Sequence, residues 1–362
     1  MHPLLLHEFH HDLAARFAAI SGTEIVTDYG DEPAEHAALT QGVGVLDFGF
    51  RSRLCLVGAD RARFLHGQVT NDVKKLRVGE GCYAAITTAK GKMESDLNIF
   101  CLKDELLLDF EPGLTEKISQ RLEKYIVADD VQILDVGAHY GLWTVQGPQA
   151  EALVRALGWF SELPGKPLAS ASISDGTLGE VYIMQNARVG TTGFDLFVPN
   201  AALALAAGKL AAAAKATGGR FCGWQAFETV RIEAGIPRYG ADMDETNIPL
   251  ECGLEGRAIT YTKGCYIGQE VINRIHSVGH VNRELRGLRL ANGITQLPRR
   301  GDKLVHAGKE AGYITSAVQS PGVGSIIALG YVRREANEIG TELTLQSDQG
   351  GTTAKIVPLP FK

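Results

Sequence analysis

The chain has 362 residues and a formal net charge of −6, with hydrophobic residues at 45% and charged residues at 22%. This length predicts two or three domains, and the composition is that of a globular protein with a sizeable core. The negative charge excludes broad nucleic-acid binding, because the phosphate backbone demands a basic face.

The sequence predicts no membrane segment and no metal site. The beginning of the chain lacks a basic segment followed by a long apolar one, and the alanine-rich tract at 201–214 is too short to span a bilayer. The six cysteines are scattered without a Cys-x-x-Cys pair, so neither zinc nor iron–sulfur ligand spacing is present. We therefore expect reduced thiols and a cytoplasmic location.

Two helices and a strand are predicted in the first 57 residues. Apolar residues spaced at three to four predict a first helix that ends near Gly22. A second helix is expected to begin at Pro33, whose fixed φ suits a first turn, and to end near Gly42. The run 53–57 is typical of a strand.

The next segment is predicted to be a compact α+β unit at 51–139. Asp60 is a candidate N-cap for a short helix that Gly67 ends. An amphipathic helix from Leu114 to Tyr125 and a strand at 131–134 come later. Between the two helices lie three β-rich runs, at 82–87, 96–102 and 106–110.

Helices and strands alternate from Pro148 to Gly235. The last helix closes at Gly235 and Pro237, a combination that stops helices. The predicted elements are a helix from Pro148 to Leu157, strands at 178–184 and 194–198, an alanine-rich helix between Asn200 and Gly218, and a helix at 224–234.

Beyond Gly279 the sequence changes to short alternating runs separated by glycine. Regularly spaced strands with turn signals predict a small antiparallel barrel over 279–362. The runs are 285–290, 303–306, 312–318, 325–332, 342–345 and 352–357.

The segment near residue 265 is the strongest functional signal. A cysteine between a lysine–glycine pair and a second glycine has room around its sulfur and a cation two residues away, which favours the reactive thiolate. The alternative is a buried thiol in a turn, where most free cysteines lie. The segment is Lys263, Gly264, Cys265, Tyr266, Ile267, Gly268, Gln269 and Glu270.

This segment resembles the hallmark of the YgfZ family of folate-binding proteins, which is similar to the glycine-cleavage T-protein, an aminomethyltransferase. The T-protein typically has aspartate where Cys265 stands. The resemblance implies an α+β, three-domain, T-protein-like folate-binding fold with tetrahydrofolate, or another reduced folate, as cofactor. It also implies a discontinuous first domain (1–50 plus 140–260), an inserted α+β domain (51–139) and a C-terminal β-barrel (279–362).

Asp96 matches the second of two T-protein aspartates, the catalytic carboxylate beside the folate nitrogens. Ser95 replaces the first aspartate, and Lys92 replaces a glycine of the same motif. A carboxylate at a cationic amine centre can orient it and stabilise developing positive charge. The alternative is a strand-start aspartate that caps its own turn.

Asp195 matches the T-protein glutamate that holds the pterin, although it is one methylene shorter. Arg188 stands where that motif has tyrosine. A carboxylate can accept two parallel hydrogen bonds from a pterin, so the resemblance implies a ligand contact. A solvent-facing strand aspartate is the alternative.

Further folate contacts are implied by resemblance alone. Arg231, at a helix end, would donate to a pterin carbonyl, and the alternative is a surface pair with Glu228. Tyr83 would pack against the aminobenzoyl ring, and the alternative is a core tyrosine. Lys90 and Lys92 would meet folate glutamyl carboxylates.

The preferred function is YgfZ-like: the protein binds tetrahydrofolate and, through Cys265, assists iron–sulfur enzymes as clients. Lys263 would favour the thiolate, while Gln269 and Glu270 would orient it. The first alternative is a true aminomethyltransferase that moves a one-carbon unit to tetrahydrofolate. The second is a folate-binding module with an inert thiol.

Overall fold

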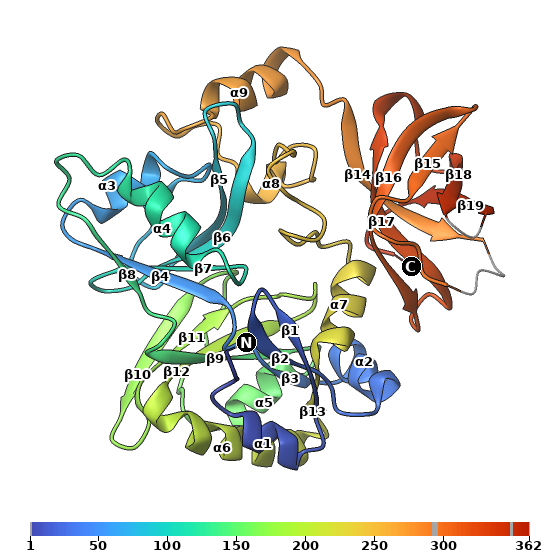
Figure 1. Ribbon diagram of the computed structural model, residues 1–362. Helices are drawn as coiled ribbons and strands as arrows, with labels where there is room; N and C mark the ends of the chain where they lie inside the picture. Colours follow the sequence, from blue (N-terminus) through green and yellow to red (C-terminus); the bar gives the residue numbers. More distant parts are fainter. Residues whose placement is uncertain (1, 292–295, 348–349, 362) are drawn as a thin grey trace. The chain divides into compact units, whose positions relative to one another are not determined.

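The computed structural model describes residues 2–291, 296–347 and 350–361 (Figure 1). The chain forms two compact units. The first contains Met1–Ala84 and Ser95–Phe227, and the second contains Ala85–Glu94 and Glu228–Lys362.

A six-stranded sheet with helices on one face is the main layer of the first unit. Helices α5 (Ala150–Ala156) and α6 (Leu203–Thr217) pack against strands of this sheet and against each other (Figure 1). All its pairs are antiparallel except the parallel pair β13–β3. In spatial order the strands are β10 (Ser170–Asp175), β11 (Gly179–Gln185), β12 (Gly193–Pro199), β9 (Tyr140–Gln146), β3 (Gly44–Asp47) and β13 (Arg220–Phe221).

The two faces of this sheet differ in chemistry. In β9, Trp143 and Val145 belong to the apolar core under the helices. Their neighbours Thr144 and Gln146 are also fully buried but polar, and alternation along a strand places them on the opposite face. Asp195 pairs with Thr144 in register and lies on that polar face.

A five-stranded sheet forms the second layer of the first unit. Helix α4 (Thr115–Glu123) packs on β4 and β8, as its apolar Ile118 and Leu122 require. In spatial order the strands are β5 (Gly81–Thr87), β6 (Met93–Cys101), β7 (Leu106–Phe110), β4 (Ser52–Val57) and β8 (Gln132–Asp135). The remaining helices of this unit are α1 (His7–Asp12), α2 (Glu32–Gln41), α3 (Arg61–His66) and the 3₁₀ turns at Val73–Lys75 and Asn200–Ala202.

The prediction of one helix up to Gly22 is wrong. Helix α1 ends at Asp12, and Arg16–Ile20 forms strand β1, which pairs with β2 (Thr23–Asp28). Ser21 and Gly22 both have positive φ, as a two-residue hairpin turn requires. Because the chain reverses direction at this turn, the last of the apolar residues that predicted a helix lie in strand β1 instead.

The barrel predicted for the C-terminal part is confirmed in the second unit. Six antiparallel strands close on themselves, and β14 pairs with both β17 and β19. In order around the barrel the strands are β14 (Arg283–Leu290), β17 (Ser325–Arg333), β16 (Lys309–Ser320), β15 (Lys303–His306), β18 (Glu342–Ser347) and β19 (Gly350–Val357).

Three helices precede the barrel in this unit. They are α7 (Trp224–Glu233), whose last turns belong here, α8 (Glu255–Ala258) and α9 (Gln269–Val278). A 3₁₀ turn at Arg334–Ala336 follows β17. The tip of the β5–β6 hairpin, Ala85–Glu94, also belongs to this unit.

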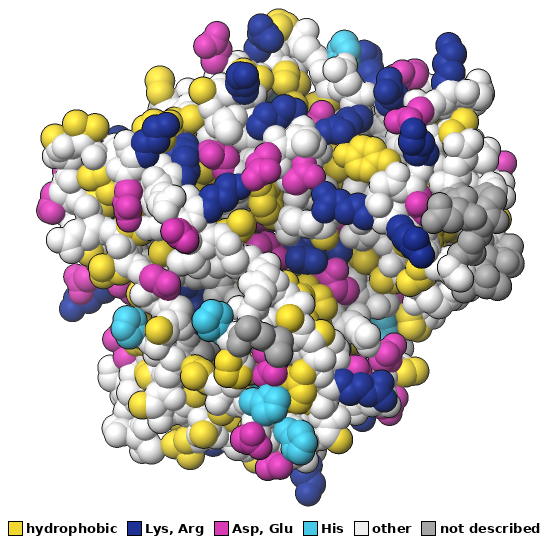
Figure 2. Space-filling model, viewed as in Figure 1, with side chains coloured by type: hydrophobic (Ala, Val, Ile, Leu, Met, Phe, Trp, Pro, Cys, Tyr) yellow, Lys and Arg dark blue, Asp and Glu magenta, His cyan; other side chains and the backbone are white. Residues whose placement is uncertain are grey.

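The α+β class is therefore confirmed, whereas the three predicted domain ranges differ from the two compact units and stay a prediction. Within the described ranges, the helices are all too short or too polar to cross a bilayer. On the face shown in Figure 2, basic and acidic side chains are interspersed.

Candidate functional site

A buried ion network crosses the polar side of the first unit. Asp109, in β7, accepts hydrogen bonds from Arg51 Nε at 2.6 Å and from Arg188 Nη2 at 2.7 Å. Arg51 Nη1 also donates to Glu111 Oε1 at 2.7 Å. Burial alone would raise the pKa of Asp109, but the charges of Arg188 and Arg51 outweigh it and hold the pKa well below its usual range.

Asp195 is part of the same network. Arg188 donates to it as a fork, with Nε 2.9 Å from Oδ1 and Nη2 2.6 Å from Oδ2. Asn186 Nδ2 donates to Oδ2 at 2.8 Å, and Asp195 is fully buried. The alternative of a solvent-facing aspartate is therefore excluded. The pterin contact stays a prediction, and it requires a change in the Arg188 fork. We call Arg51, Asp109, Glu111, Arg188 and Asp195 the Asp109 network.

Asp96 and Tyr83 form a second, smaller group on neighbouring strands β6 and β5. The Tyr83 hydroxyl donates to Asp96 Oδ2 at 2.7 Å. The other oxygen, Oδ1, is buried and has no hydrogen-bond partner within the described structure. Burial, followed by the negative charge of Glu111, raises the pKa of Asp96 to about 6, against opposing effects of Tyr83 and Arg51. The Asp96 carboxyl is thus an acceptor with one open oxygen, poised to titrate near neutrality.

Arg231, in the second unit, is almost completely buried and fully hydrogen-bonded. Nε and Nη2 donate to the Glu228 carboxylate, at 3.2 and 2.8 Å. Nη2 also donates to Ser316 Oγ at 3.0 Å, while Nη1 donates to Ile236 O at 3.3 Å and to Asp242. A guanidinium group has five N–H donors, so all five are used.

The ion pairs of Arg231 give its charge a structural role. Burial works to lower the pKa of Arg231, but the carboxylates of Asp242 and Glu228 outweigh it and raise the pKa above its ordinary value. A register shift in β16 between Ile314 and Ser316 marks a bulge around Thr315, whose hydroxyl donates to Asp242 Oδ1 at 2.6 Å. The pterin contact of Arg231 stays a prediction that requires an exchange of partners.

The cysteine segment lies before α9 in the second unit. Cys265 is exposed, so its alternative as a buried thiol is excluded, and all six cysteines are free thiols. Lys263 is buried, with Nζ 4.8 Å from the centre of the Tyr266 ring. No described hydrogen bond joins the Gln269 or Glu270 side chain to the Cys265 sulfur, so the orienting roles remain predictions; Gln269 Nε2 donates instead to Gly264 O at 3.5 Å.

The hairpin tip at 85–94 holds this segment in place. Thr87 Oγ1 donates to Ile267 O at 2.7 Å. Gly268 has φ +91°, and a Cβ added there would lie 2.5 Å from Thr87 Oγ1 and 2.6 Å from Thr88 O. Lys92 Nζ donates to Thr246 O at 2.6 Å, a backbone contact that the sequence did not indicate. Gly268 is therefore required by both its conformation and its surroundings.

The sequence analysis missed Asp109, which pairs with Arg188, and Asp242, which pairs with Arg231. Asp109 lies in the otherwise apolar run Leu106–Phe110, and a buried carboxylate in such a strand requires a cation. The aspartate within this apolar run was therefore the signal in the sequence for a buried ion pair. Asp242 had no comparable signal, because it lies in a loop between α7 and α8.

The described residues contain no group of three His, Cys, Asp or Glu side chains placed to hold a metal ion. The candidate groups for chemistry are Asp96, with its buried open oxygen, in the first unit and the exposed Cys265 in the second.

Family models match nearly the whole chain. Residues 6–263 match the GCVT N-terminal domain. Residues 283–362 match the glycine cleavage T-protein C-terminal barrel domain.

Individual proteins match over similar lengths. The aminomethyltransferase of Rubrobacter xylanophilus is 30% identical over 359 residues, which cover 98% of this chain and 93% of that protein. The aminomethyltransferase of Geobacillus thermodenitrificans is 31% identical over 353 residues, covering 96% and 94%. The crystal structure of glycine cleavage system aminomethyltransferase T from Bartonella henselae superposes with a TM-score of 0.88 at 23% identity, covering 99% of this chain and 98% of that one. This likeness confirms the T-protein-like fold predicted from the sequence.

Replacing Gly268 with alanine is expected to destabilise the protein by about 2–5 kcal/mol, because left-handed strain and overpacking add. Gly253→Ala is the matched control, since Gly253 has φ +70° but a Cβ added there would meet nothing within 4 Å. The control should cost only about 1–2 kcal/mol. Urea unfolding midpoints measure both, and equal losses would refute the close contact at Gly268.

Asp96→Asn is expected to stabilise the protein at pH 8 but not at pH 4. The folded-state pKa of about 6 lies above the ordinary 3.8, so the folded state binds more protons between these values. Wild-type stability therefore falls as pH rises through this window, by about 1–3 kcal/mol, and asparagine removes the loss. Thermal unfolding at both pH values tests this, with the exposed Asp104→Asn as control. A stabilisation that is independent of pH would contradict it.

Proposed function

The chain belongs to the glycine cleavage T-protein family, and from this premise we propose that it transfers a one-carbon unit from an aminomethyl donor to tetrahydrofolate. The family model of the N-terminal domain alone spans residues 6–263. The family uses tetrahydrofolate, and the matched relatives are named aminomethyltransferases. These matches support the aminomethyltransferase interpretation better than the YgfZ-like one that the sequence favoured.

The observation that carries the proposal is the open oxygen of Asp96. A buried acceptor without a partner is costly, and an N–H or cationic amine of a ligand would satisfy it. The Tyr83 hydroxyl holds the other oxygen, so the carboxyl has a defined orientation. A reduced folate offers both an N–H donor and amine nitrogens, and its chemistry therefore fits this group.

The two other predicted pterin contacts, Asp195 and Arg231, would each have to give up a hydrogen bond that they make in the structure. Asp195 would meet the pterin only by giving up part of the Arg188 fork, and Arg231 only by exchanging one of its five acceptors. We therefore assign Asp96 and Tyr83 as the principal folate contacts of the first unit, with Asp195 as a secondary one.

Asp96 would act by its charge. Tetrahydrofolate supplies the nucleophilic nitrogens that accept the one-carbon unit. Above pH 6 the Asp96 carboxylate is ionised, so it can accept a hydrogen bond from an amine and stabilise positive charge that develops there. Below pH 6 this stabilisation is lost.

Incubation with tetrahydrofolate and an aminomethyl-lipoyl carrier should yield methylenetetrahydrofolate, ammonia and the free dihydrolipoyl carrier, with kcat rising through an apparent pKa near 6. Asp96→Asn should lower kcat by about 10²–10⁴-fold, because the amide cannot carry the charge. Asp104→Asn, at an exposed turn, should leave kcat unchanged. No product from the wild-type protein with fresh folate would refute the transferase function.

A second function rests on a different observation, the exposure of Cys265. We propose as the alternative that the protein is YgfZ-like and assists iron–sulfur enzymes through this thiol, with folate bound. Support comes from the Lys263 to Glu270 segment and from the accessibility of the sulfur ahead of α9. An exposed thiol is open to a client, whereas the buried thiols Cys55, Cys222 and Cys252 are not.

The two functions separate in a Cys265→Ala variant. If the thiol serves client enzymes, this variant loses their activity in cells while it still makes methylenetetrahydrofolate, and iodoacetamide labels wild-type Cys265 faster than it labels free N-acetylcysteine. Cys101→Ala, at a partly buried thiol, is the control. Labelling at the rate of N-acetylcysteine, together with full client activity in Cys265→Ala, would overturn the alternative.

A further inference from the structure

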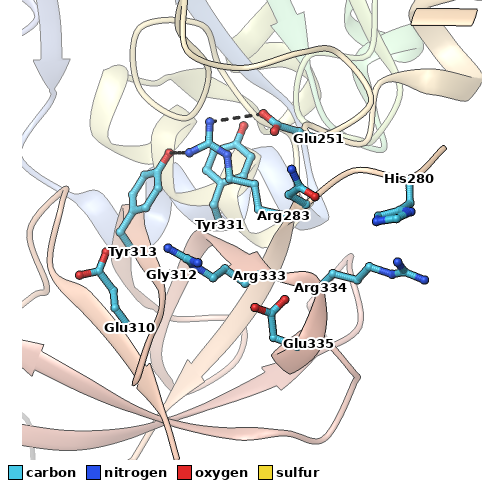
Figure 3. Close-up of a pocket in the computed structure, with 11 residues that line it drawn as sticks. Glu251, His280, Arg283, Glu310, Gly312, Tyr313, Tyr331, Arg333, Arg334 and Glu335 are labelled. Carbon is cyan, nitrogen blue, oxygen red and sulfur yellow. Dashed lines mark hydrogen bonds and ion pairs between the residues drawn. The ribbon is translucent and has the colours of Figure 1, made fainter. Parts of the chain in front are cut away.

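A cavity of about 810 Å³ lies at one edge of the barrel in the second unit (Figure 3). Its walls come from the start of β14, from β16, and from the end of β17 with the turn that follows. Small-molecule sites typically have volumes of about 300–1,000 Å³. The cavity is thus large enough for a metabolite.

One cation of the cavity, Arg283, is already engaged. Nη1 donates to the Tyr313 hydroxyl at 3.1 Å, and Nη2 lies 3.3 Å from Glu251 Oε2. Its guanidinium carbon is 5.0 Å from the centre of the Tyr331 ring and 5.7 Å from that of Tyr313. Tyr331 is itself almost fully buried. The rings are therefore occupied by Arg283, so the cavity offers little surface for stacking a nucleotide base.

The acidic lining is partly neutralised as well. Glu251 pairs with Arg283, and Glu310 pairs with Lys303 at 2.8 Å. The remaining acidic side chain of the lining is Glu335, whose negative charge opposes the positive charges of the cavity.

Two arginines of the cavity are available to a ligand. Among the described residues, the guanidinium groups of Arg333 and Arg334 make no hydrogen bond or ion pair, and both residues are exposed. Arg333 is close enough to Glu310 for its charge to lower the pKa of that carboxyl, after the larger effect of Lys303. Figure 3 shows that they point in opposite directions, Arg333 toward Gly312 and Arg334 toward the side of His280. The free positive charge is therefore split between two ends of the cavity.

We propose that this cavity binds a small, extended oligocarboxylate, with one carboxylate at Arg333 and another at Arg334 and His280. Arginine forks suit carboxylates, and two diverging forks select a chain with separated anionic groups over a compact anion. This site is independent of the function proposed for Asp96. It uses a different unit and different residues.

Calorimetry of the full chain with γ-linked triglutamate tests the site, with inorganic phosphate as the compact probe. Arg333→Gln and Arg334→Gln should each weaken triglutamate binding about tenfold or more, as loss of a charge-assisted contact predicts. Glu335→Gln should strengthen binding severalfold, because it removes a repelling charge. Arg155→Gln is the control: Arg155 is an exposed arginine on α5 that pairs with Glu151.

Four results would overturn the proposal: no saturation at millimolar triglutamate, equal binding by all the arginine variants, equal affinity for inorganic phosphate, or tighter binding of α-linked than of γ-linked triglutamate. The last would assign the cavity to an acidic protein segment instead of a small molecule. Circular dichroism checks the fold of each variant, and both arginines are exposed and make no hydrogen bond, so folding is expected to be unaffected.

Discussion

The first unit depends on the neutralisation of one buried carboxylate, Asp109. It lies on β7 of the five-stranded sheet, and Arg188 joins it to Asp195 on β12 of the six-stranded sheet. A single guanidinium group therefore connects the two layers. Removing one member of such a network leaves an uncompensated buried charge, at a cost of about 3–5 kcal/mol, so the connection is maintained whenever the unit is folded.

The same constraint sets the chemistry of Asp96. Arg51 has both Asp109 and Glu111 to neutralise, so Asp96 receives only a part of its charge. Burial raises the pKa of Asp96 most, and the negative charge of Glu111 adds to it. An aspartate with a pKa near 6 thus follows from its position beside a network whose cations are already engaged.

Local patterns in the sequence predicted the helices and strands that have one solvent-exposed face and clear turn residues at their ends. The barrel strands were recognised because glycine-rich turns separate half-buried runs, and α2 because Pro33 and Gly42 mark its ends. Strand β9 was missed although apolar and polar residues alternate from Trp143 to Gln146; both sets are fully buried, so the strand lacks the solvent-exposed face that marks the other predicted strands. The candidate site residues were identified by motif, but the partners that the structure gives them were not. Arg188 and Asp109 are 79 positions apart, and only the fold brings them together.

The two residues that depart from the T-protein motif, Arg188 and Asp195, contact each other in the structure. Arg188 replaces a tyrosine and Asp195 replaces a glutamate, and the two new residues form a fork with each other. Arg188 thereby neutralises the buried carboxylate of Asp195 as well as that of Asp109. A pterin in this unit must therefore compete with Arg188 for Asp195, while Asp96 Oδ1 has no partner to displace. The proposed folate contact therefore depends mainly on Asp96, whose free oxygen is an acceptor and whose carboxyl is oriented by the Tyr83 hydroxyl.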